Sequence, residues 1–334
     1  MKTPPRIDQS SAALMARVQA LIGAPLRRVD DIFAEEISSR SPYVREILDH
    51  LAGYRGKRMR PMLVLLSGQA CGGDREAHCV IAAAIEMIHT ATLVHDDILD
   101  EATTRRHVAT INSRWTNETS VLLGDYLFTH AFHLTSSLGD AAACRAIGRA
   151  TNKVCEGEMS QIGERGNLDL SEETYLEIIE GKTAELCAVA CELGARHSGA
   201  SEEVCQSFDG YGRDLGIAFQ IADDLLDVVG NEKQTGKTLG SDLEKQKLTL
   251  PIIHLLAHSR GAQSDRVRDL LSRPGPRSRE ELLPLLASAG SIDYARARAV
   301  EYTVSARQRL QCVPDSPARQ VLDAMADFVA IRSA

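Results

Sequence analysis

Apolar residues recur at intervals of three and four positions along almost the whole chain. This spacing places them on one face of an α-helix. The alternating patterns and Asn-Gly signals that would indicate strands and hairpins are missing. The predicted helices are Ala12–Phe33, Val44–Ala52, Met62–Ala70, Glu76–Asp100, Thr119–Leu138, Ala141–Gly157, Ser171–His197, Glu202–Val229, Thr249–His258, Arg279–Ala289, Ile292–Cys312 and Pro317–Ile331. The pattern therefore predicts an all-α protein that is larger than a four-helix bundle.

Two segments interrupt the helical pattern. Val229–Leu248 is rich in Gly, Lys and Thr, and Ser259–Ser278 carries Pro274, Gly275 and Pro276. We expect both to be loops, the second a surface loop with no chemistry. Since no change in composition marks a boundary, we expect a single domain over residues 1–334, with about residues 1–11 disordered.

Composition narrows the class of protein. The chain has 334 residues, 44% of them apolar, a net charge of -8 and a pI near 5.7, which disfavours a nucleic-acid-binding surface. The most apolar long window, Val80–Leu99, contains Glu86, His89, His95, Asp96 and Asp97, which predicts a buried helix and no membrane span. Eight scattered Cys, without a Cys-x-x-Cys pair, and a polar N-terminus predict a cytoplasmic protein with reduced thiols.

The acidic pattern Asp-Asp-x-x-Asp occurs twice, each time in or directly after apolar helical sequence. One such triplet is usually a solvated helix face, but two copies embedded in apolar sequence are hard to explain as surface. Residues four apart share a helix face, so the charges within each triplet repel each other. A hard divalent cation such as Mg²⁺ would compensate these negative charges. Phosphate oxygens of the substrate would complete the coordination shell of the cation. The candidate metal ligands are Asp96, Asp97, Asp100, Asp223, Asp224 and Asp227.

Basic residues lie where a diphosphate site needs them. Arg side chains match phosphate oxygens with two parallel hydrogen bonds, and Lys supplies a point charge. Each position alone is more often a solvated surface charge. Together with two metal clusters they predict a site for two phosphorylated ligands, one bound through metal and one through cations alone. The candidate positions are Lys57, Arg58, Arg60, Arg105, Arg106, Lys182, Lys237 and Lys247.

Other classes of protein share parts of this pattern. Glu86-x-x-His89 matches half of a di-iron carboxylate motif, but the second half is absent. His95-Asp96 is typical of some helical phosphohydrolases, although this leaves the Asp repeat unexplained. A terpene cyclase would account for the first Asp cluster but not for the second. A non-catalytic scaffold subunit would be expected to lack one cluster.

Nine segments, in order, resemble the trans-isoprenyl diphosphate synthases of the polyprenyl synthetase family. They are GKRMRP, EMIHTATLVHDDILD, TTRR, VLLGDYL, GEMSQ, GKTAEL, GIAFQIADDLLD, TGKTLGSDL and KLTLP. The resemblance covers nearly the whole chain. It implies an all-α isoprenoid synthase bundle around a deep central cavity, usually as a homodimer. It also implies head-to-tail addition of isopentenyl diphosphate to an allylic diphosphate, giving trans double bonds.

The resemblance also implies a role for each matching residue. Asp96 and Asp100 would bind two Mg²⁺ ions and Asp223 a third, with Mn²⁺ as a substitute and Asp97, Asp224 and Asp227 in support. Arg105, Lys182 and Lys237 would hold the allylic diphosphate, and Lys57, Arg60, His89 and Arg106 isopentenyl diphosphate. Thr183 and Gln220 would shield the carbocation, and Lys247 would join the substrate-binding set.

Three positions depart from the family pattern. His107 and Ala109 stand where Gly and Pro are usual, and Gln246 replaces a usual Gly before Lys247. Because every charged position is kept, we expect these changes to affect loop shape more than chemistry.

The resemblance implies that residues of the helix before the first Asp cluster set the length of the product. In the family, bulky residues there stop chain growth. The positions here are Ile88, Ala91 and Thr92, and none is aromatic. The run HTATLVHDD resembles long-chain synthases of the octaprenyl and solanesyl type, so we expect a product of octaprenyl length or longer, which would bring the protein near membranes. The alternatives are a geranylgeranyl or farnesyl diphosphate synthase and a non-catalytic regulatory subunit of a heteromeric synthase.

Overall fold

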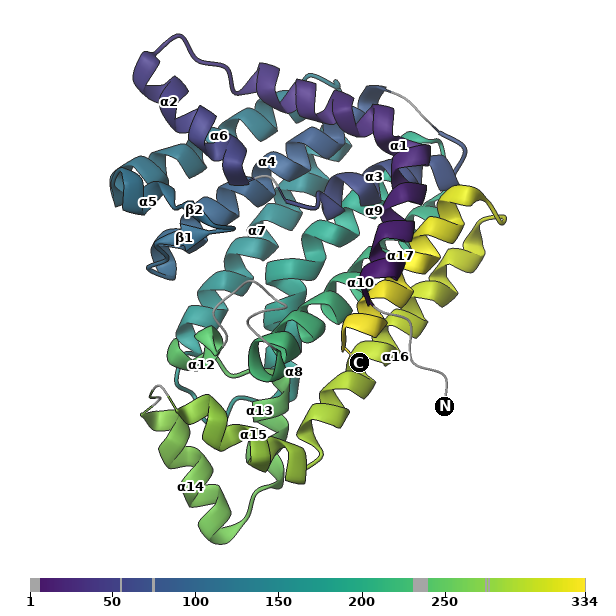
Figure 1. Cartoon of the computed structure of the whole chain (residues 1–334). Coiled ribbons are helices and arrows are strands. Elements are labelled where there is room, and N and C mark those ends of the chain that lie inside the picture. The colour runs from purple at the N-terminus through teal and green to yellow at the C-terminus, as the bar shows by residue number, and fades with distance from the viewer. Residues whose placement is uncertain are drawn as a thin grey trace.

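The computed structural model describes residues 7–54, 56–73, 76–230, 240–273, 275 and 277–333. This part of the chain is almost entirely helical, which confirms the predicted all-α class (Figure 1). The elements are α1 (Ile7–Glu36), α2 (Pro42–Leu51), η1 (Ala52–Tyr54), α3 (Met59–Ala70), α4 (Glu76–Leu99), β1 (Thr104–Arg105), β2 (Val108–Ala109), α5 (Ile111–Arg114), α6 (Asn117–Ser136), α7 (Ala141–Gly163), α8 (Glu172–Ile179), η2 (Glu180–Ala184), α9 (Glu185–His197), α10 (Glu202–Val229), α12 (Ser241–Glu244), α13 (Leu250–His258), α14 (Gly261–Ser272), α15 (Ser278–Ser288), α16 (Ser291–Arg309), η3 (Leu310–Cys312) and α17 (Pro317–Ser333).

Helix α10 organises the bundle. It packs against α9 on one side and α16 on another, while α4 packs against α6 and α3 (Figure 1). α1 and α2 cover one end of the bundle, and α13, α14 and α15 form the other (Figure 1). The buried apolar residues form two clusters, and α10 contributes to both, with Phe208 and Tyr211 in the first and Ile221 and Leu225 in the second. The helix that carries the second Asp cluster is therefore fixed along its length by packing.

Helix α4 owes its apolar composition to this packing. By length and composition it is the one helix in the described ranges that could cross a bilayer, and 67% of its most apolar stretch is buried inside the fold. Its interior residues Ile81, Ile85 and Ile88 are fully buried between neighbouring helices. The expectation of a buried protein helix agrees with this placement.

One expectation about irregular segments is wrong. The predicted loop Ser259–Ser278 contains helix α14, in which Val267 and Leu271, four residues apart, are buried. Together with the partly buried Leu270 they form a narrow apolar stripe that faces the core, so the sequence signal is weak. At the N-terminus, α1 begins at Ile7, and the expected disorder over about residues 1–11 stays a prediction.

Residues 104–109 form a two-stranded hairpin that the sequence pattern did not predict. Thr104 pairs with Ala109 and Arg105 with Val108, so Arg106 and His107 form the turn. Both turn residues have positive φ, 51° and 66°. A two-residue turn of this type favours Gly, because L-residues with a Cβ are strained there. The same reason applies to Gln246, whose φ is 54°. Two of the three departures from the family pattern therefore place a side chain at a left-handed position.

The first prediction follows from this strain. His107→Gly should raise the free energy of unfolding by roughly 1 kcal/mol, because it removes the Cβ from a left-handed residue. His107→Ala is the matched control, since alanine removes the imidazole and keeps the Cβ. Denaturant unfolding of both variants distinguishes the two effects. An equal gain in the alanine variant would mean that the imidazole, and not the backbone, carries the strain.

Candidate active site

A cavity of about 1440 Å³ runs between α1, α3, α4, α7 and α10. It exceeds the roughly 300–1,000 Å³ of ordinary small-molecule sites, so it has room for a long ligand. Its lining combines apolar residues with charged groups from distant parts of the chain, including Lys57, Arg60, Asp96, Lys182 and Asp223. The structure thus brings one residue from each Asp cluster to a single cavity.

The first Asp cluster divides its three carboxylates between different environments. Asp96 lines the cavity, and burial raises its pKa to about 6 although Lys182 acts in the opposite direction. Asp100 is not among the residues that line the cavity, and its oxygens contact the Nζ atoms of Lys247 at 3.0 Å and Lys245 at 3.2 Å. Burial alone would raise the pKa of Asp100, but these two ammonium groups hold it below its ordinary value.

Asp97 points away from the cavity. Its side chain is 1% exposed and accepts hydrogen bonds from Arg105 Nε at 2.8 Å and from the Tyr54 hydroxyl at 2.9 Å. The Tyr54 oxygen in turn accepts from the Ile111 amide, so the hairpin is tied to α4. In this structure the Asp97 carboxylate positions Arg105, and its expected supporting role at a metal stays a prediction.

The second Asp cluster shows the same division. Asp223 lines the cavity, whereas the buried Asp224 accepts hydrogen bonds from the Tyr175 hydroxyl at 2.6 Å and Gln220 Nε2 at 2.7 Å. Asp224 is therefore also a positioning residue, and burial raises its pKa. An Asp227 oxygen accepts from the Asp242 amide at 3.3 Å. Asp242 was missed in the sequence because it stands alone, yet burial and the nearby Asp227 raise its pKa.

Lys182 and Thr183 lie on η2, a π-helical turn between α8 and α9. Single π-turns are frequent at functional sites because they re-aim side chains. Lys182 Nζ contacts Glu158 Oε2 at 2.7 Å, and the Thr183 hydroxyl donates to Gln220 Oε1 at 2.9 Å. All four side chains line the cavity. Glu158 is a site residue that sequence reasoning missed, because a single Glu on an amphipathic helix carries no motif.

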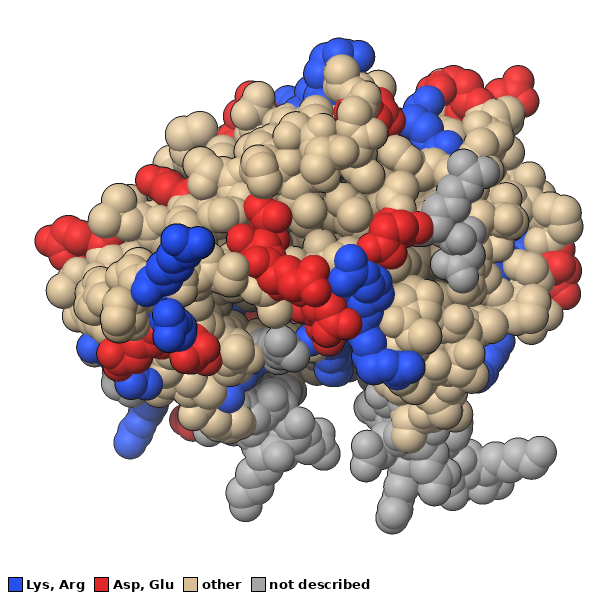
Figure 2. Space-filling view, turned by 90° about the horizontal axis from the view of Figure 1, so that it is seen from above, with Lys and Arg blue, Asp and Glu red and all other residues tan. Residues whose placement is uncertain are grey.

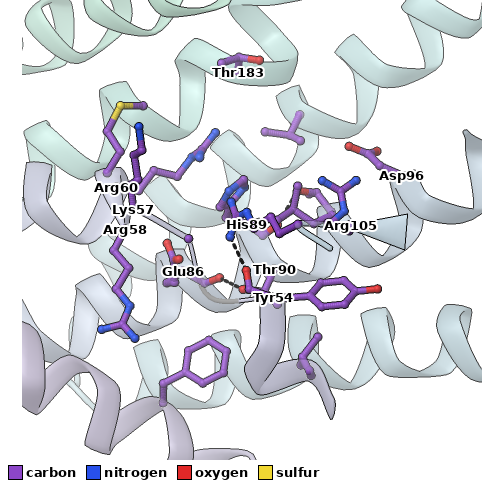
Figure 3. A pocket seen from close by; sticks show the side chains of 18 of the residues that line it. Tyr54, Lys57, Arg58, Arg60, Glu86, His89, Thr90, Asp96, Arg105 and Thr183 are labelled. Atoms are coloured by element: carbon purple, nitrogen blue, oxygen red, sulfur yellow. Dashed lines mark hydrogen bonds between the residues drawn. The ribbon is translucent and has the colours of Figure 1, made fainter. Parts of the chain in front are cut away.

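A second group of basic residues lies at the end of the cavity away from Asp96. Figure 3 shows Lys57, Arg58 and Arg60 at one end of the pocket and Asp96 and Arg105 at the other, with His89 between them. Arg106 donates to the Tyr54 carbonyl, and Arg58 pairs with Asp30 of α1. Glu86 lies among these cations. Burial raises its pKa to about 7, although Arg60, Arg58 and Arg106 lower it, and burial holds the pKa of His89 well below its ordinary value.

The candidate product-length residues do not behave alike. Thr92 lines the cavity. Ile88 and Ala91 are fully buried and are not among its lining residues. A position five residues before Asp96 lies on a different face of α4, and the expected role of Ala91 in product length stays a prediction.

Lys237 lies outside the described residues, so its expected role stays a prediction. Lys247 joins the site through its contact with Asp100. Carboxylates of Asp96 and Asp223 from two helices face one cavity, and oxygen donors of this kind fit Mg²⁺. On the face shown in Figure 2, acidic and basic side chains are interspersed and no broad basic surface is seen, which agrees with the net charge.

A large cavity with two Asp carboxylates at one end and a group of Lys and Arg side chains at the other is suited to phosphorylated, largely apolar ligands. The polyprenyl synthetase family model matches residues 41–287. Octaprenyl diphosphate synthase of Escherichia coli (strain K12) is 35% identical over 319 residues, which cover 95% of this chain and 99% of that protein. The chain therefore belongs to the polyprenyl synthetase family.

Two solved structures share the fold over essentially the whole chain. Decaprenyl diphosphate synthase from Rhodobacter capsulatus has a TM-score of 0.91 at 37% identity, covering 96% of this chain and 99% of that one. A polyprenyl synthase from Caulobacter crescentus CB15, solved with calcium and isoprenyl diphosphate, has a TM-score of 0.90 at 32% identity and covers 100% of both chains.

The second prediction concerns the close approach of α7 to the π-turn. A Cβ on Gly157 would lie 2.5 Å from the Lys182 backbone nitrogen, so one of the two segments must move. Gly157→Ala should destabilise the protein by roughly 1–3 kcal/mol and lower activity, because it displaces Lys182 and Thr183. Gly148→Ala on the same helix is the control, since its Cβ would meet only Phe132 at 3.9 Å. Denaturation and steady-state kinetics of both variants test this; full activity in Gly157→Ala would contradict it.

Proposed function

We propose that this protein condenses isopentenyl diphosphate head-to-tail onto an allylic diphosphate and releases a long-chain trans-polyprenyl diphosphate. The observation that carries this is the single cavity joining Asp96 and Asp223 to a separate group of cations around Lys57 and Arg60. Membership of the polyprenyl synthetase family and the long-chain synthases among its relatives support it. The size of the cavity favours a long product over a farnesyl or geranylgeranyl product.

The chain's own residues divide the reaction between two ends of the cavity. Asp96 and Asp223 would hold Mg²⁺, supported by Asp100, while Lys182 and Arg105 contribute positive charge near the allylic diphosphate. Bound Mg²⁺ would stabilise the negative charge that develops on the departing diphosphate. Three ions are the expected number, and the calcium in the Caulobacter structure supports a divalent cation. Lys57, Arg60 and Arg106 would bind isopentenyl diphosphate through charge-assisted hydrogen bonds.

The reaction needs no general base from a side chain. The carbon–oxygen bond of the allylic diphosphate breaks and its electron pair leaves with the diphosphate. The isopentenyl double bond then supplies the pair for the new carbon–carbon bond. A proton is lost from the resulting cation, and the departing diphosphate is the proposed acceptor. Thr183 and Gln220, held together and buttressed by Asp224, would face the cation with oxygen dipoles.

The oligomeric state and the cellular location of the enzyme are also proposed. The chain would act as one domain over residues 1–334 and as a homodimer, because α6 exposes large apolar side chains, among them Val121, Leu122 and Phe132. All eight cysteines are free thiols, which supports a cytoplasmic location. A non-catalytic subunit is disfavoured because both Asp clusters and the cationic group are intact.

The third prediction tests the function itself. Purified protein with labelled isopentenyl diphosphate, an allylic primer and Mg²⁺ should form polyprenyl diphosphates, identified by mass after dephosphorylation. Excess EDTA should abolish synthesis, and Asp223→Asn should lower it by orders of magnitude, because the diphosphate charge is then uncompensated. Synthesis that persists in EDTA would exclude the metal-dependent mechanism. No synthesis with metal and a range of primers would favour the non-catalytic subunit.

The fourth prediction uses the buried Glu86. Its ionised form neutralises part of the charge of Arg58, Arg60 and Arg106, while Asp30 of α1 opposes its ionisation. Deprotonation should therefore weaken isopentenyl diphosphate binding, so KM for this substrate should rise as pH increases through about 7. Glu86→Gln, which cannot ionise, should remove this component of the pH profile and leave KM for the allylic primer unchanged. An identical profile in the variant would exclude Glu86 as its source.

The fifth prediction concerns product length. Thr92 lines the cavity, so Thr92→Phe should place a ring in the path of the growing chain and shorten the product, while the diphosphate chemistry continues. Ala91→Phe is the matched control on the adjacent buried position. It should destabilise the protein without a specific shortening. Mass analysis of the products of both variants shows which position limits chain length. A shorter product from Ala91→Phe alone would show that Ala91, and not Thr92, limits chain length.

A further inference from the structure

A second cluster of potential metal-binding side chains lies outside the large cavity. Glu36 is the last residue of α1, and His130 and His133 are one turn apart on α6. Both Nδ1 atoms lie 2.8 Å from the same Glu36 oxygen, Oε1. Each of the three side chains offers one potential ligand atom, and these three atoms lie within 4.8 Å of one another.

We propose that Glu36, His130 and His133 form a binding site for a borderline transition-metal cation of the Zn²⁺ class, separate from the Mg²⁺ site. Two imidazole nitrogens and one carboxylate oxygen are ligands that favour Zn²⁺, Co²⁺, Ni²⁺ or Cu²⁺ over Mg²⁺. Three protein ligands leave at least one position of the metal for water.

The distances between Glu36 and the two histidines need little change to admit a metal. Metal–ligand bonds of about 2.0–2.1 Å hold tetrahedral ligands about 3.3 Å apart. Each Nδ1 would therefore move away from Oε1 by roughly half an ångström. Each neutral ring that donates from Nδ1 would shift its proton to Nε2, so Nδ1 becomes available to the metal.

Neighbouring contacts hold the three ligands in place. The Tyr126 ring packs on His130 with centroids 4.2 Å apart, and its hydroxyl donates to the Ile37 carbonyl at 3.3 Å. The Glu36 side chain is 16% exposed and that of His133 is 75% exposed, so the carboxylate is fixed while one face of the cluster opens to solvent. Burial raises the pKa of Glu36, but the hydrogen bonds from His130 and His133 outweigh it, so the carboxylate is ionised at neutral pH.

The position of the cluster gives the metal a structural consequence. Phe33, Ala34 and Ile37, at the end of α1 and just after it, line the large cavity. A cation held by Glu36 and the two histidines would tie this wall to α6.

Spectroscopic titration tests the site without reference to activity. The full-length protein in excess Mg²⁺ is titrated with Co²⁺, whose visible absorption is strong in four- or five-coordinate imidazole sites and weak in octahedral oxygen sites. We expect one equivalent to bind with intense absorption, displacement by one equivalent of Zn²⁺, and a higher unfolding temperature with Zn²⁺. Asp223→Asn should leave this signal intact, because the Asp clusters do not contribute to it.

Three substitutions assign the ligands. His133→Ala, at a largely exposed side chain, and Glu36→Gln, which keeps the side-chain size, should each weaken Co²⁺ binding at least tenfold while synthesis with Mg²⁺ continues. His258→Ala, at an exposed histidine on α13, should leave binding unchanged. Absence of Co²⁺ and Zn²⁺ binding to the wild-type protein would overturn the proposal and leave the cluster as a hydrogen-bonded clamp. Unchanged binding in both ligand variants, or equal loss in His258→Ala, would also overturn it.

Discussion

The architecture of the site depends on one constraint: carboxylates on buried helices need compensating partners from elsewhere in the chain. Each Asp of the first cluster has a different one. Lys182 on the π-turn acts on Asp96, Arg105 on the hairpin holds Asp97, and Lys245 and Lys247 neutralise Asp100. Because an unpaired buried charge is strongly destabilising, these contacts fix η2, the hairpin and the segment before α13 around α4. The charge pattern of the site is thus also part of what orders the fold.

The sequence was sufficient to predict the helical class and the family of the chain. Helical periodicity places the Asp repeats on helices, and repulsion within each repeat predicts a cation. It could not show how the carboxylates divide between solvent and interior. Asp97 and Asp224 look like ligands in the motif, yet Tyr54, Arg105, Tyr175 and Gln220 occupy their oxygens. Such partners come from remote segments, and spacing carries no information about them.

The same limit explains the residues that were missed. Glu158 and Asp242 are single acids without a motif, and they join the site only because α7 and α12 approach it. The distance of Ala91 along α4 could not show that its side chain is fully buried, because a helical face also depends on which neighbours pack against it. In contrast, the unusual residues His107 and Gln246 were visible in the sequence, and their positive φ values give those departures a physical meaning.

The charge distribution also suggests how two diphosphates can be distinguished in one cavity. At the Asp96–Asp223 end, carboxylates face Lys182 and Glu158 adds further negative charge, so a diphosphate without metal would be repelled. At the Lys57–Arg60 end, Glu86 and Asp30 offset only part of the charge of four basic side chains, so a diphosphate binds there directly. In the proposed mechanism, metal ions held by Asp96 and Asp223 would reverse the preference of the first end and leave the second unchanged. Selection between two chemically similar head groups would then rest on the requirement for metal at one end, and the cavity between them would hold the apolar chain.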